Sequence, residues 1–179
     1  MRRQAAVAAS LATVLALSSC GSGDPVVPKS LCGTSIDPAL SRPLLEPLNR
    51  EVEQDGPVDR RAGETGHCIV WVGDDAAMEF WFAWGSGAPN LVELSGPDTT
   101  YRLTKVTPTD LGFEGVVGNE GAKAWTPCTT AGGDSFMLSV NFPRVDRMSA
   151  KLRPAIEKFM KAYMKNTVTT LGCGKPAVR

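Results

Sequence analysis

The sequence predicts an α+β domain in which an antiparallel β-sheet packs against a C-terminal amphipathic helix and a short N-terminal helical segment. Three observations predict this fold class. Runs rich in aromatic and β-branched residues alternate in polarity through the middle of the chain, as half-buried strands do. Glycine, asparagine and aspartate separate these runs at intervals typical of hairpins. After residue 148 the apolar residues recur every three or four positions, which indicates a helix.

The first 20 residues have the pattern of a bacterial lipoprotein signal. Arg2 and Arg3 precede an apolar run over residues 5–17, which is too short for a bilayer span of about 20 residues. The run ends in LSSC, which resembles the lipobox that a dedicated peptidase cuts before a lipid-modified cysteine. We therefore expect a signal peptide over residues 1–19 and acyl chains such as palmitate on Cys20. An ordinary secretory signal with a chance cysteine is the alternative.

The number of cysteines agrees with lipidation of Cys20. Five cysteines leave one thiol unpaired in an exported protein, and lipidation of Cys20 lets the other four form two disulfides. The chain has no C-x-x-C pair and one histidine, His67, so we expect neither a metal site nor a cofactor. Three pairings are possible for the four remaining residues, which are Cys32, Cys68, Cys128 and Cys173.

Charge and length limit the classes of partner and the number of domains. The 179 residues contain 19 basic and 19 acidic side chains, so the chain has no electrostatic footprint for nucleic acid. Membrane contact is then expected through the lipid anchor alone. Residues 20–30, rich in glycine, serine and proline, predict a flexible tether. Residues 31–173 suffice for one globular domain, and residues 174–179 are expected to be a tail.

A short helix and a loop are expected at the start of the domain. Asp37 and Pro38 have the pattern of an N-cap followed by proline at the first helical position. Pro43 and Pro47 prevent a long helix there. The polar residues 51–66 predict a loop.

The predicted strands follow this loop. They cover residues 67–72 and 77–84 as one hairpin, 99–106 as a weaker strand, 115–128 as a hairpin turning at 119–121, and 135–143. In the second of them the period of two sends Phe80 and Phe82 to the core and Trp81 to the opposite face.

Trp81 is the main candidate for a binding residue, and Trp71 is the second. Either a terminal helix covers Trp81, or Trp81 lines a groove for an apolar or carbohydrate-like ligand or a protein partner. A closed apolar pocket lined by Trp71, Trp81, Trp84 or Trp125 would identify such a site.

The C-terminal helix is expected over residues 148–167. Its apolar stripe contains Leu152, Ile156, Phe159 and Tyr163, which we expect to pack on the sheet. Ser149 is a candidate N-cap. Pro154 either kinks this helix or marks its true first turn.

The segments LCGTSIDPALSRPLL, HCIVWV, VGNEGAKAWTPC and IEKFMKAYMKNTVTTLGC resemble small four-cysteine lipoproteins of actinomycetes, a family without assigned biochemistry. A more distant similarity is to exported lipoproteins with a PsbP-like or Mog1-like fold. The resemblance implies an antiparallel sheet with helices on its faces. It also implies the pairing Cys32 with Cys68 and Cys128 with Cys173, in which each bridge ties a terminal segment to a nearby strand.

Catalytic signals are weak. His67 adjoins Cys68, which is expected in a disulfide, and Ser86 in WGSGA lacks the first glycine of G-x-S-x-G. Two carboxylate pairs are the remaining candidates for cation binding or acid–base chemistry, Asp74 with Asp75 and Glu79 with Glu93. We expect a non-enzymatic, lipid-anchored binding or interaction module on the outer face of the cytoplasmic membrane, with an unknown protein or small-molecule partner. A divergent extracytoplasmic hydrolase and a passive structural envelope protein are the alternatives.

Overall fold

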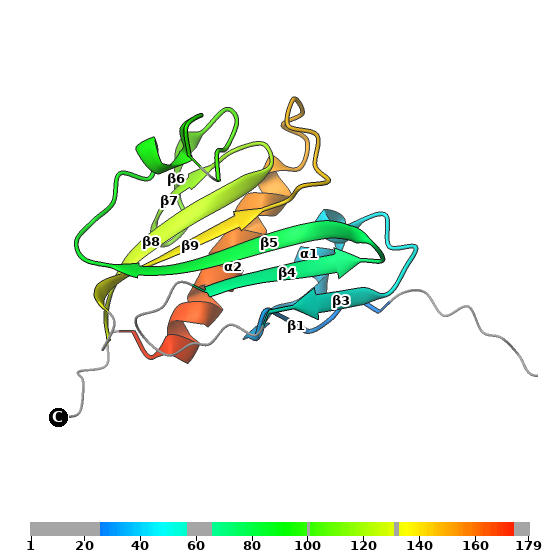
Figure 1. The fold of residues 1–179 in the computed structure, drawn as a ribbon, viewed down its shortest axis with the longest axis horizontal. Helices are drawn as coiled ribbons and strands as arrows, with labels where there is room; N and C mark the ends of the chain where they lie inside the picture. The colour runs from blue at the N-terminus through cyan, green and yellow to red at the C-terminus, as the bar shows by residue number, and fades with distance from the viewer. Residues whose placement is uncertain (1–25, 57–65, 100, 131–132, 174–179) are drawn as a thin grey trace, which may run out of the picture.

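The computed structural model describes residues 26–56, 66–99, 101–130 and 133–173. The predicted signal peptide, Cys20 and the 174–179 tail lie outside these residues. In chain order the elements are β1 (Ser30–Leu31), β2 (Thr34–Ser35), α1 (Pro38–Leu45), β3 (Val52–Asp55), β4 (Gly66–Val72), β5 (Asp75–Gly85), the 3-10 helix η1 (Glu93–Ser95), β6 (Thr107–Asp110), β7 (Glu114–Val117), β8 (Gly121–Thr130), β9 (Gly133–Asn141) and α2 (Arg153–Leu171). The fold is α+β, as predicted (Figure 1).

A seven-stranded sheet forms the centre of the fold, in the order β3-β4-β5-β9-β8-β7-β6, and every neighbouring pair is antiparallel. Hairpins β4–β5 and β8–β9 lie side by side because β5 pairs with β9, with Phe80 opposite Val140. The hairpins predicted around residues 73–75 and 119–121 are present as β4–β5 and β7–β8. β1 and β2 form a separate two-stranded sheet.

One face of the large sheet packs against α2, which crosses behind it in Figure 1. Phe80 of β5 is buried, and the centroid of its ring lies 4.8 Å from that of Tyr163 and 6.3 Å from that of Phe159, both on α2. Leu138 and Ile156 are fully buried in the same core. Burying side chains of this size contributes about 1.5–3 kcal/mol each. The predicted apolar stripe therefore does pack on the sheet.

The N-terminal segment is attached to this core by a disulfide. Cys32, between β1 and β2, bonds to Cys68 of β4, which confirms the first pairing. Val27 is buried and Ser30 belongs to β1, so packing starts before residue 31, where the domain was expected to begin. Asp37 caps α1, with Oδ1 accepting a hydrogen bond of 2.9 Å from the backbone N–H of Ala39.

The C-terminal helix starts later than its apolar pattern predicted. It begins at Arg153, not residue 148, and Pro154 lies in its first turn, where a missing N–H costs nothing. Ser149 is not its N-cap, because the Ser149 hydroxyl accepts from Lys151 N–H in the preceding turn. Cys173, just after the helix, bonds to Cys128 of β8 and confirms the second pairing.

Three segments differ from their predicted conformation. β3 lies within residues 51–66, which were expected to form a loop, and β6 was not expected. Both are short edge strands with mostly exposed side chains, and such strands need no apolar alternation. Residues 99–106 were expected to be a strand, but the described part of this segment contains none. Lys105 there adopts a left-handed backbone with φ of 52°.

Candidate binding pocket on the outer face of the sheet

The face of the sheet opposite α2, here called the outer face, is partly covered by the connection between β5 and β6. Leu91 and Leu103 of this connection pack on Val116 of β7, and Trp125 and Met137 border the cluster. This second, smaller core explains why the connection follows the sheet without joining it as a strand. It also leaves the rest of the outer face available for polar and aromatic side chains.

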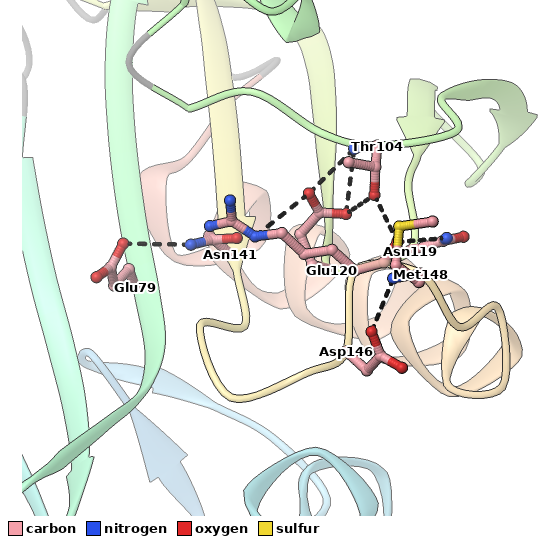
Figure 2. A network of polar contacts seen from close by, with 8 residues as sticks. Glu79, Thr104, Asn119, Glu120, Asn141, Asp146 and Met148 are labelled. Atoms are coloured by element: carbon pink, nitrogen blue, oxygen red, sulfur yellow. Dashed lines mark hydrogen bonds and ion pairs between the residues drawn. The ribbon is translucent and has the colours of Figure 1, made fainter.

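Two buried charged residues hold the connection in place. Lys123 of β8 donates a hydrogen bond from Nζ to the carbonyl oxygen of Leu94, and burial lowers the pKa of this lysine to about 8. Glu120, which is fully buried, accepts from the backbone N–H of Thr104 at 3.0 Å and from its hydroxyl at 2.6 Å (Figure 2). The path of the connection is therefore determined by charge-assisted hydrogen bonds.

Trp81 lies on the outer face, as its position in the strand predicted, but neither helix covers it. Its indole stacks on the imidazole of His67, with ring centroids 3.7 Å apart. The ring of Trp81 also contacts that of Tyr101 in the connection, with centroids 4.2 Å apart. Of the two alternatives for Trp81, coverage by a terminal helix is thus wrong, because both helices pack on the opposite face. Trp81 packs against the ring of Tyr101 and does not line any of the pockets described in the following paragraphs.

A polar pocket of about 400 Å³ opens next to Tyr101, between the connection, β5 and the segment after β9. Its volume falls in the range of small-molecule sites. The residues that line it are Glu79, Pro97, Thr99, Tyr101, Arg102, Asn141, Pro143 and Arg147. We call this the polar pocket.

Hydrogen-bonding groups in the polar pocket are left without protein partners. Asn141 donates weakly from Nδ2 to Glu79 Oε2 at 3.4 Å, and its buried Oδ1 has no partner among the described residues (Figure 2). Arg102 has no side-chain partner in the described part of the chain. Among the described residues, the Arg147 side chain reaches only Glu120, with Nε 3.9 Å from Oε1. Of these groups only Asn141 Oδ1 is buried, whereas both arginines are exposed to water. An unsatisfied buried acceptor costs free energy, and a ligand that donates to it would remove that cost.

The pocket contains charges of both signs that do not neutralise each other. No ion pair joins Glu79 to Arg102 or Arg147 among the described residues, although all three line the same pocket. The phenol of Tyr101 lies close to Glu79: desolvation and, to a lesser degree, the carboxylate charge raise the pKa of Tyr101. The pocket thus presents a carboxylate, a phenol and an amide oxygen together with two guanidinium groups.

An apolar pocket of about 520 Å³ adjoins the polar pocket. Pro97, Arg102 and Arg147 line both of them. The apolar pocket is bordered by Val92, which is 49% exposed, and Met148, which is 85% exposed. The two arginines therefore stand between a polar and an apolar part of the same surface.

The four tryptophans are not gathered in one closed pocket. Trp71 lies on the outer face opposite Glu53 of β3, in an open groove of about 500 Å³ that Asp55 and Asp74 also line. Trp84 and Trp125 both line a small cavity of about 110 Å³ at the end of β5, but Trp84 packs against the main core and Trp125 against the smaller one on the outer face. The structure therefore separates the two tryptophans, Trp71 and Trp81, that were the predicted binding residues.

The candidate catalytic residues are not arranged as an active site. Cys68 is in a disulfide, and the Nε2 atom of His67 has no hydrogen-bond partner among the described residues. Ser86 lines the small cavity beside Trp84, whereas His67 stacks on Trp81. In the described part of the chain, His67 therefore has no hydrogen-bonded hydroxyl that it could activate as a base.

The candidate carboxylates lie in different surroundings. Asp74 forms an ion pair with Arg50, with Oδ2 2.8 Å from Nη1. Glu79 lines the polar pocket, whereas Glu93 is exposed on η1 outside it. In the described ranges, no cluster of three or more histidine, cysteine or acidic side chains could hold a metal ion.

Sequence reasoning missed Tyr101, Arg102, Asn141 and Arg147 because they come from two irregular segments and one strand end. Only Asn141 could have been found from the sequence, because it is a polar residue on the non-core side of a regular strand.

Among the described helices, none is long and apolar enough to cross a membrane. Comparison with protein families, curated proteins and solved structures found no match for this chain. The resemblance to actinomycete lipoproteins stays a hypothesis.

Proposed function

We propose that the protein is a lipid-anchored binding module of the cell envelope that takes up a small polar ligand in the polar pocket. The signal-like N-terminus and the cysteine at position 20 support anchoring on the outer face of the cytoplasmic membrane. Two disulfides are compatible with that oxidising location. Binding without turnover is favoured over hydrolysis because the only histidine stacks on an indole ring, away from Ser86.

The observation that carries the ligand proposal is the set of polar groups without partners around one concave space. Asn141 Oδ1 is buried and unpaired, and Arg102 offers a whole guanidinium group. A ligand that pairs with these groups replaces water at a site where the protein supplies no partner of its own. Among the described residues, the open groove beside Trp71 has no buried unpaired side-chain atom, and the small cavity beside Trp84 has one, Nε1 of Trp125.

The test is a binding screen on the intact lipoprotein, purified in an uncharged polyoxyethylene detergent. Sugars, amino acids, nucleotides, dicarboxylates and inorganic phosphate are added to isotope-labelled protein, and amide shifts are followed by NMR. We expect at least one compound to shift the signals of Tyr101, Arg102 and Asn141. Arg102→Gln should weaken that binding, and Arg42→Gln, on an exposed position of α1, should not. Shifts confined to the surroundings of Trp71 or Trp84, or none at all, would contradict the proposal.

A further inference from the structure

The polar pocket keeps its two signs of charge apart, and this separation indicates the class of ligand. Glu79 lies on β5, in the middle of the sheet, while Arg102 and Arg147 come from the connection and from the segment before α2. Both arginines are exposed, so water solvates their guanidinium groups where no ion pair forms. Here no nitrogen of either arginine comes within 4.0 Å of Glu79 in the described part of the chain.

The negative side of the pocket suits an ammonium group. Glu79 supplies a carboxylate, and the unpaired Oδ1 of Asn141, whose amide nitrogen contacts that carboxylate, supplies a neutral acceptor. Tyr101, which lines the same pocket as Glu79, adds an aromatic ring. An ammonium has three donors and no acceptor, so these groups match its chemistry.

The positive side suits a carboxylate or a phosphate. Guanidinium groups bind both through paired N–H donors, and the terminal nitrogens of Arg102 and Arg147 have no acceptor among the described residues. A ligand with an anion alone would satisfy the arginines but would also meet the charge of Glu79. A ligand with a cation alone would pair with Glu79 but would be repelled by the two arginines.

From this arrangement we infer that the ligand of the polar pocket is a zwitterion, a small molecule with an ammonium and a carboxylate or phosphate group a few bonds apart. The inference rests on the proposed function and specifies its ligand class. The ammonium lies against Glu79 and Asn141, and the anion lies against Arg102 and Arg147. A free amino acid and a phosphoethanolamine head group are two sources of this chemistry, and the experiment separates them.

The experiment is a calorimetric titration of the intact lipoprotein, in the same uncharged detergent, with the twenty protein amino acids and with O-phosphoethanolamine. The best amino acid is then compared with its N-acetyl derivative, which lacks the ammonium, and its amide, which lacks the carboxylate. We expect the unmodified zwitterion to bind about tenfold or more tightly than either derivative, because each derivative loses a charge-assisted contact. Tighter binding of O-phosphoethanolamine would identify the head group as the source.

Variants assign each charge to its side of the pocket. In Glu79→Gln the advantage of the amino acid over its N-acetyl derivative should disappear, while its advantage over the amide remains. In Arg102→Gln the advantage of the amino acid over its amide should disappear, while its advantage over the N-acetyl derivative remains. This cycle separates a lost contact from a general effect on folding. The matched controls are Glu93→Gln and Arg42→Gln, at exposed positions outside the pocket, and all four variants should melt within a few degrees of wild type.

The two proposals fail in different ways. If sugars, dicarboxylates or phosphate bind in the polar pocket and no zwitterion does, the zwitterion inference is wrong and the binding function stands. Equal affinity for the amino acid and its N-acetyl derivative would also overturn the inference. If no compound in either panel binds, the binding function falls together with its ligand.

Discussion

Lys123 should make the protein more stable as the pH rises from 7 toward 9.5, and Lys123→Met should remove this gain. Burial lowers the pKa of the lysine from 10.5 to about 8 in the folded protein. Between these two values the unfolded chain binds more protons than the folded one, so the free energy of unfolding rises with pH. Below pH 7 both states are protonated and the contribution stops changing.

The size of the gain follows from the same two values. With a folded pKa of about 8, linkage gives an upper limit of about 2 kcal/mol between pH 7 and 9.5. Screening by water and salt reduces this limit, and we expect about 1 kcal/mol. The raised pKa of Tyr101 acts in the opposite direction, but only near and above the ordinary value of 10.0, so it leaves this window unaffected.

The assay is urea unfolding followed by tryptophan fluorescence, without reductant, at several pH values from 7 to 9.5. Wild type should gain stability relative to Lys123→Met across this range, whereas Lys158→Met, an exposed lysine on α2, should follow wild type. Parallel curves for wild type and Lys123→Met would refute the reasoning. They would mean that the ammonium loses little hydration on folding, or that its hydrogen bond to the Leu94 carbonyl compensates for the loss.

Three further outcomes are expected. Cys20→Ala should leave the precursor uncut or release the protein from membranes, and detergent partitioning equal to wild type would contradict lipidation. Trp81→Ala should lower the free energy of unfolding by about 1–3 kcal/mol, because Trp81 is only partly buried and the variant loses its ring contacts with His67 and Tyr101. Thermal melting of wild type and variant measures this loss. A loss near 5 kcal/mol would contradict the prediction and place Trp81 in a closed core. Replacing Cys128 and Cys173 together by alanine should cost about 4 kcal/mol, because a loop of 45 residues is no longer closed, and an unchanged unfolding midpoint would contradict this.

Local patterns in the sequence were sufficient for the elements whose side chains alternate between core and solvent. β4, β5, β9 and the apolar stripe of α2 were predicted because one face of each is buried, and burial repeats with the period of the backbone. The N-cap at Asp37 was predicted for a different local reason, since its bond reaches only two residues along the chain. The disulfide pairing was implied by resemblance and is present in the structure.

The candidate site was decided by contacts between residues far apart in the chain. Glu120 holds Thr104, which lies 16 residues away, and Lys123 holds Leu94, which lies 29 residues away, so the course of the connection has no local signature. That course brings Tyr101 onto Trp81 and Arg102 into the same pocket as Glu79 and Asn141. Sequence alone therefore determined which residues face the core. Only the tertiary structure decided which polar residues share a pocket, because that depends on where buried charges find their partners.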